Sequence, residues 1–78
     1  MVNEMRANVK INKTWQGYEI ETSDPYTKGY GDRSHLYVFN VYNNQVRWVT
    51  DYTHAKHYKS KAYAEALVKK IKEGGVRV

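Results

Sequence analysis

The chain contains no cysteine, one proline and one phenylalanine among its 78 residues. Without cysteine it has neither a disulfide framework nor a thiolate metal site, which fits a reducing compartment. No run approaches the roughly 18 apolar residues that cross a bilayer, and the N-terminus lacks the apolar stretch of a signal peptide. We therefore expect one small soluble domain in the cytoplasm with no membrane partner, because so short a chain makes one domain at most.

Negative charge is scarce in the second half of the chain. Residues 1–46 hold five lysines and arginines against five acids, whereas residues 47–78 hold eight against three. The whole net charge of +5 therefore comes from the second half. This asymmetry favours a surface that faces a polyanion, although a requirement for solubility would produce the same composition.

Phenylalanine is nearly absent, but the chain has eight tyrosines. A tyrosine ring packs against apolar neighbours while its hydroxyl stays hydrated, so the residue suits half-wet surfaces. Eight such rings exceed what a core of this size needs. We expect some of them to face a partner.

Two hairpins and a loop are predicted in the first two thirds of the chain. Residues 1–7 are polar and predict a frayed leader. Residues 8–22 alternate apolar and polar positions with a change of phase at Trp15-Gln16-Gly17, which predicts a β-hairpin with Trp15 near its tip. Residues 23–35 predict a long loop that holds the only proline.

The second hairpin, residues 36–52, is predicted around Asn43-Asn44, because asparagine tolerates the left-handed conformation of a tight hairpin turn. The resulting register places side chains on a common core face as opposed pairs, namely Val41 with Val46, Phe39 with Trp48 and Tyr37 with Thr50.

A C-terminal helix is predicted over residues 60–73, with Ser60 as N-cap and Gly74 as the stop. Its apolar face would consist of Tyr63, Ala64, Leu67, Val68 and Ile71. The expected fold is α+β, a small antiparallel sheet of two β-hairpins with one C-terminal helix packed on one face.

The segment from Tyr52 to Lys61 has the densest mixture of lysine, histidine and tyrosine. Lysines bind phosphates with release of counterions, and tyrosine rings stack on unpaired bases. The segment and its surroundings therefore predict a DNA- or RNA-binding surface, with phosphate contacts at Arg47, Lys56, Lys59, Lys61 and Lys69 and stacking at Tyr52 and Tyr58. Alternatively, Tyr58 packs beneath the helix and the lysines only hydrate the turn.

A second hypothesis is a protein-binding inhibitor or adaptor. Tyrosine is frequent in the residues that dominate protein interfaces. The contact residues would then be Tyr26 and Tyr30 in the long loop and Tyr42 on the outer face of the second hairpin. A third hypothesis is a homodimer that pairs through an exposed edge of the sheet.

Catalysis, metals and cofactors are not expected. His54 and His57 stand three residues apart without converging third and fourth ligands, so no metal site is predicted. Ser34-His35 ahead of a hairpin and a helix resembles HicA-type mRNA interferase toxins, which implies His35 as a general base. However, the Gly-Ser that precedes histidine in that family is interrupted here, and its N-terminal helix is replaced by strand-like sequence.

A broader resemblance covers residues 36–73. Trp48-Val49-Thr50 ends a hairpin, and Ala55 to Lys61 then opens a helix that carries an inward Ala64. This order is similar to small β-hairpin–helix proteins of bacteriophages and prophages. The resemblance implies an accessory protein in a bacterial host cell that binds nucleic acid or host proteins, including anti-defence inhibitors such as anti-CRISPR proteins.

Overall fold

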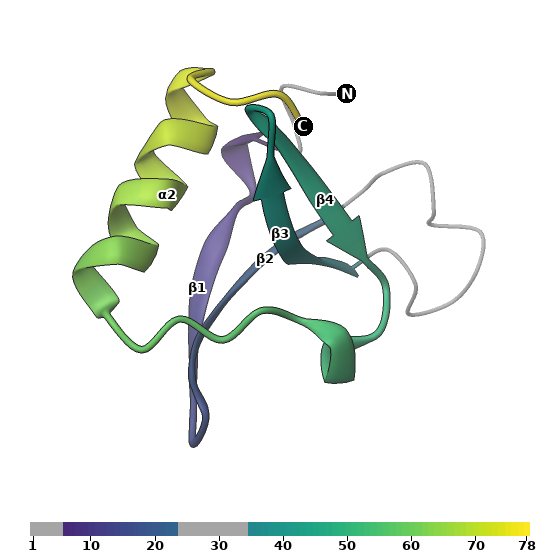
Figure 1. Cartoon of the computed structure of the whole chain (residues 1–78), viewed down its shortest axis with the longest axis vertical. Helices are drawn as coiled ribbons and strands as arrows, with labels where there is room; N and C mark the ends of the chain where they lie inside the picture. Colours follow the sequence, from purple (N-terminus) through teal and green to yellow (C-terminus); the bar gives the residue numbers. More distant parts are fainter. Residues whose placement is uncertain (1–5, 24–34) are drawn as a thin grey trace.

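Four antiparallel strands and one helix make up the described chain in this computed structural model, which covers residues 6–23 and 35–78 (Figure 1). The strands lie in the sheet in chain order, β1 (Lys10–Thr14), β2 (Gly17–Ser23), β3 (His35–Tyr42) and β4 (Gln45–Val49). A 3-10 turn, η2 (Tyr52–His54), precedes the helix α2 (Lys61–Glu73). The predicted α+β fold is confirmed. Most of the predicted leader and loop lies outside the described residues.

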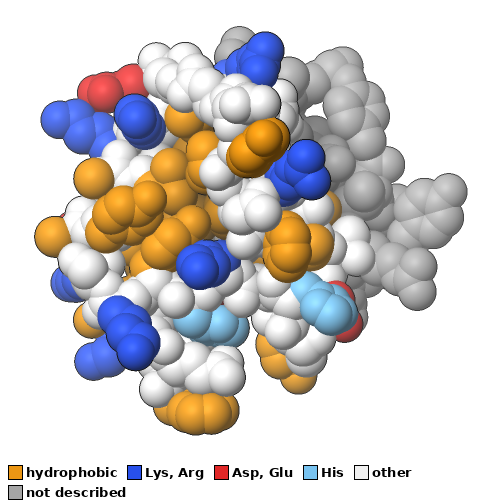
Figure 2. Space-filling view, in the orientation of Figure 1, with side chains coloured by type: hydrophobic (Ala, Val, Ile, Leu, Met, Phe, Trp, Pro, Cys, Tyr) orange, Lys and Arg blue, Asp and Glu red, His pale blue; other side chains and the backbone are white. Residues whose placement is uncertain are grey.

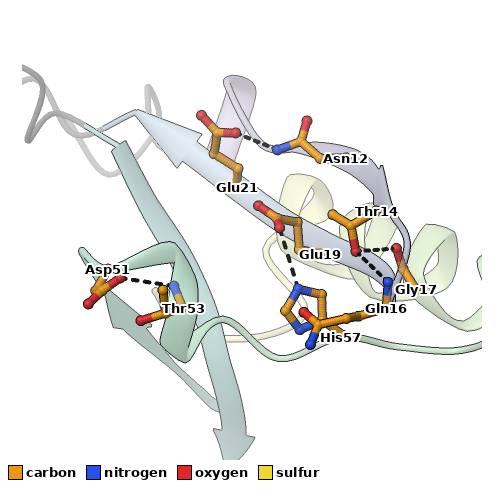
Figure 3. A network of polar contacts seen from close by, with 9 residues as sticks. All are labelled: Asn12, Thr14, Gln16, Gly17, Glu19, Glu21, Asp51, Thr53 and His57. Carbon is orange, nitrogen blue, oxygen red and sulfur yellow. Dashed lines mark hydrogen bonds and ion pairs between the residues drawn. The ribbon is translucent and has the colours of Figure 1, made fainter.

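The first hairpin turns at Trp15 and Gln16, as the change of phase predicts. Thr14 pairs with Gly17, and the Thr14 hydroxyl donates to the Gly17 carbonyl oxygen at 3.1 Å while it accepts from the Gln16 N–H at 3.1 Å (Figure 3). Gly17 has a φ of 132°, a value that side-chain-bearing residues rarely adopt. The turn leaves Trp15 exposed at the tip of the hairpin.

The second hairpin turns at Asn43 and Asn44, whose φ angles of 52° and 62° are those of the predicted left-handed turn. The three pairs nearest the turn have the predicted register. A β-bulge between Val38 and Asn40 then shifts the rest by one residue, so that Val38 rather than Phe39 faces Trp48. The predicted core face is therefore wrong beyond the bulge. Val38 is fully buried and Phe39 is exposed, because a one-residue slip exchanges the two faces of a strand.

The helix α2 has the predicted limits. The Ser60 hydroxyl accepts from the Tyr63 N–H at 3.2 Å, and Gly74 ends the helix with a φ of 82°. Ala64, Leu67 and Ile71 are buried against the sheet, whereas Tyr63, expected on the same face, is mostly exposed. The helix packs on β1 and β2 and joins their apolar residues in one core.

The C-terminal end of α2 is held by the start of the described chain. One nitrogen of the Arg6 guanidinium donates to the carbonyl oxygens of Ile71 at 2.8 Å and Val76 at 2.9 Å. Carbonyls in the last turn of a helix have no partner within the helix, and a cation there also favours the helix dipole. Arg6, which the sequence places in a frayed leader, thus has a structural role.

The linker, residues 55–60, completes the sheet. β2 and β3 pair over only three positions and then diverge. In the gap, the Lys56 N–H donates to the Val38 carbonyl oxygen at 2.8 Å, and Tyr58 and Tyr18 exchange two hydrogen bonds of 2.8 Å. Figure 1 shows the linker passing below the sheet on its way to α2. The linker is therefore bonded to both hairpins.

Candidate nucleic-acid interface

The exposed surface of the described chain is strongly cationic. Ten lysine and arginine side chains are exposed there, against three carboxylates, those of Asp51, Glu65 and Glu73. Glu19 and Glu21, which balance cations in the sequence, are buried. The exposed cations are Lys10, Lys13, Arg47, Lys56, Lys59, Lys61, Lys69, Lys70, Lys72 and Arg77.

These cations are not neutralised locally. Within residues 6–23 and 35–78, the ion pairs between side chains use histidine as the base, and no lysine or arginine pairs with a carboxylate. An ammonium group without an internal partner can exchange its water for a phosphate oxygen at low cost. The surface is therefore available to a polyanion.

The predicted phosphate contacts are divided between two faces. Lys61 and Lys69 lie on the exposed side of α2, and Lys56 and Lys59 belong to the linker that leads into it. Arg47 follows the buried Val46 on β4, so its side chain points to the sheet face away from α2. There its guanidinium lies 5.8 Å from the centre of the Tyr42 ring. Arg47 therefore does not join the helix lysines.

The predicted stacking residues also differ in access. The Tyr58 ring is half-buried and packs on the ring of Tyr63, with 5.1 Å between centroids. Burial raises the pKa of Tyr58, because a buried phenolate would lose its hydration. Tyr52 in η2 is 65% exposed, and Tyr63 is 58% exposed. Tyr63, which helical spacing assigns to the core, thus offers an open ring that Tyr58 does not.

A shallow groove of about 400 Å³ runs along α2. Its lining combines the Tyr63 ring and apolar Ala66 and Leu67 with Lys69 and Lys70, and Glu73 closes it. Figure 2 shows hydrophobic side chains gathered in the middle of this face, with lysine and arginine around them. An apolar floor with cations at its margin suits a strand whose bases stack and whose phosphates face lysines.

A layer of buried polar side chains lies on the outer face of the sheet, the face away from α2 (Figure 3). Glu21 accepts from the Asn12 amide at 2.5 Å and pairs with His35 at 2.5 Å. Glu19 pairs with Nε2 of His57 at 3.5 Å. Burial, followed by the Glu21 and Glu19 carboxylates, raises the pKa of Tyr37 beside them.

The sequence did not predict this layer. Glu19 and Glu21 alternate with Tyr18 and Ile20, a pattern typical of a solvated strand face. The chain after β4 returns across this face and brings Tyr52, Thr53 and His57 around Glu19. There Asp51 begins η2 by accepting from the Thr53 N–H at 2.9 Å. That hydrogen bond lowers the pKa of Asp51. A crossing of this kind has no local sequence signal.

Two other sequence hypotheses concern the rest of the surface. Tyr42 is exposed at the end of β3, whereas Tyr26 and Tyr30 lie outside the described residues. For edge pairing, the two outer strands differ. β4 is bonded to the C-terminal segment through Val46 and Arg77, whereas β1 is the strand at the other end of the sheet order.

Neither a metal cluster nor a membrane span emerges from the described chain. No group of three or more potential ligands among histidine, aspartate and glutamate converges within those residues. None of its helices has the length and apolar character needed to cross a membrane. Comparison with known protein families, curated proteins and solved structures finds no match. Function must therefore be inferred from the charge and geometry of the chain itself.

Proposed function

We propose that this protein is a small non-catalytic binding module that contacts nucleic acid through the lysines of α2 and the linker. The observation that supports the proposal best is the excess of ten exposed cations over three exposed carboxylates in the described chain. Burial of Glu19 and Glu21 makes this excess larger than the sequence indicates. A phage-type accessory protein in the cytoplasm of a bacterial host would meet such a partner.

The contacts follow from the positions of the side chains. Lys69 and Lys70 border the groove along α2, and Lys59 and Lys61 flank the helix N-cap. The exposed Tyr63 ring lies in the same groove, where it can stack on an unpaired base. The proposed interface therefore favours single-stranded over double-stranded nucleic acid, since a paired base does not expose its face.

The test is titration of fluorescent single-stranded RNA and DNA of mixed sequence at several salt concentrations. The logarithm of the binding constant should fall linearly with the logarithm of salt concentration. The slope of this line should be about −0.7 for each phosphate that the protein neutralises. Lys69→Gln should weaken binding to all sequences and make the slope shallower. Arg47→Gln removes the same charge from the other face and should leave the affinity nearly unchanged.

Absence of binding at low salt, or binding that does not respond to salt, would overturn the proposal. Equal losses for Lys69→Gln and Arg47→Gln would show that net charge alone is responsible and that α2 is not the interface.

A second function, a protein-binding inhibitor or adaptor, is favoured by the outer hairpin face. Phe39 and Tyr42 are exposed on β3, and Arg47 lies over the Tyr42 ring. Exposed aromatic residues beside an arginine are typical of interface hot spots. A pull-down from nuclease-treated bacterial lysate tests this function. Capture that survives nuclease and is lost in Tyr42→Ala would support it, and capture abolished by nuclease would contradict it.

A further inference from the structure

A pocket of about 380 Å³ lies between the tip of the first hairpin and η2. It corresponds to the notch between the lowest lobe and the lobe to its right in Figure 2. Thr14, Trp15 and Gln16 come from the hairpin tip, Tyr52 and Thr53 from η2, and Glu19 and His57 complete the lining. Its volume falls within the roughly 300–1,000 Å³ of ordinary small-molecule sites.

Glu19 gives this pocket an unusual acceptor. Glu19 is only 6% exposed, yet no hydrogen-bond donor of the described chain reaches its carboxylate. The one polar contact of that carboxylate is the 3.5 Å ion pair with His57. Glu21, two residues along the same strand, has both oxygens engaged, one by Asn12 and one by His35. A buried carboxylate normally collects several donors because its desolvation is costly. Glu19 therefore has acceptor capacity left for a ligand in the pocket.

The walls of the pocket are aromatic and open. Trp15 is 92% exposed and Tyr52 is 65% exposed, so most of each ring is left free. The hairpin turn itself is made by the Thr14 hydroxyl and Gly17, and does not use the indole. Two exposed rings that line one pocket form a site for a flat ligand that stacks.

From these features we infer that the pocket binds one unpaired guanine base of the nucleic acid. Guanine presents two adjacent N–H donors on its Watson–Crick edge, at N1 and N2, and a carboxylate presents two acceptors at matching separation. The ring would stack on Trp15 and Tyr52. This inference rests on the proposed function, because the exposed linker lysines Lys56 and Lys59, which stand on either side of the pocket-lining His57 along the chain, would take the neighbouring phosphates.

Surface charge decides between a base and a competing occupant. An acidic pocket with aromatic walls also suits a lysine or arginine side chain of a partner protein. A cationic partner would approach a surface whose exposed cations outnumber its exposed acids by ten to three in the described chain, and would be repelled. An oligonucleotide would be attracted by the same surface.

The experiment compares short oligouridine strands that differ in one central base, guanine, adenine or cytosine, at a single moderate salt concentration. The wild-type protein should bind the guanine strand roughly tenfold more tightly than the adenine strand. Glu19→Gln replaces one acceptor by a donor, which matches the acceptor and donor on the edge of adenine. This variant should lose the preference for guanine and gain relative affinity for adenine.

Trp15→Ala provides the second variant. Because Trp15 is almost fully exposed, its removal should leave the melting temperature unchanged. It should lower affinity for the guanine strand roughly tenfold and affect plain oligouridine less. Guanosine monophosphate should quench the fluorescence of Trp15 in the wild type and in Trp48→Phe, whereas adenosine monophosphate should have a weaker effect.

The outcomes separate this inference from the proposed function. Salt-sensitive binding without any base preference, unchanged in Trp15→Ala and Glu19→Gln, would overturn the guanine pocket and leave the nucleic-acid interface of α2 intact. Absence of binding to every oligonucleotide would overturn the proposed function as well. Quenching by an acetylated arginine amide but not by guanosine monophosphate would assign the pocket to a partner's cation and overturn the inference.

Discussion

At Gly17 the backbone of the first hairpin lies against the linker without room for a side chain. Its φ of 132° is strained for any side chain, and a Cβ placed there would lie 2.6 Å from the Tyr58 carbonyl oxygen. Gly17→Ala should therefore lower the free energy of unfolding by about 2–3 kcal/mol, as measured by urea denaturation.

The matched control is Gly74→Ala at the end of α2. Gly74 also has a positive φ, but a Cβ at this position would meet no atom within 4 Å. This change should cost about 1 kcal/mol, for the backbone conformation alone. An equal decrease in the free energy of unfolding for the two variants would show that contact with Tyr58 adds nothing to the cost of a Cβ at residue 17.

At the scale of single elements, Arg6 links the first described turn to the end of α2. Arg6→Ala removes two charge-assisted hydrogen bonds to the carbonyls of Ile71 and Val76. The free energy of unfolding should fall by about 1–2 kcal/mol, measured by thermal or urea unfolding. Lys72→Ala, an exposed change in the same last turn, should shift it by about 0.5 kcal/mol or less. A loss for Arg6→Ala no larger than this would contradict the capping role.

Elements with local signals were predictable from the sequence. Ser60 and Gly74 mark the limits of α2, and Asn43-Asn44 marks the turn of the second hairpin. The bulge at Phe39 was not predictable, because no glycine or other local signal separates it from a regular strand. It arises where β3 leaves β2 and accepts a hydrogen bond from Lys56, a residue of the linker. Tertiary context therefore decided that Val38, rather than Phe39, is buried.

At the scale of the whole molecule, the fold changes the effective charge of the surface. The charge count places the excess of lysine and arginine in residues 47–78, and the lysines of α2 and the linker in that range are exposed. The burial of Glu19 and the pocket that it lines depend on side chains brought together from β2, η2 and the linker. Pairing over such distances along the chain has no signature in a single sequence. The basic surface could be predicted, but the pocket could not.

Alkaline pH should destabilise the whole fold through Tyr58. Burial, with a smaller contribution from Tyr63, raises the pKa of Tyr58 in the folded state. The folded protein therefore holds this proton more tightly than the unfolded chain, so stability is complete below about pH 10 and falls as the pH rises through the folded-state pKa. Tyr58→Phe should flatten this loss in urea denaturation series between about pH 9 and 11. An unchanged pH profile in the variant would contradict it.

The insertion of the linker between β2 and β3 also has a consequence for synthesis on the ribosome. A nascent chain that has emerged only as far as β4 can form both hairpins, which then meet over three residue pairs. At that stage the N–H and carbonyl groups of Tyr18 lack their partner Tyr58, and the Val38 carbonyl lacks the N–H of Lys56. Unpaired strand edges of this kind are where neighbouring chains associate. Emergence of residues 55–58 therefore pairs these edge groups, and emergence of α2 afterwards covers the apolar face of the sheet.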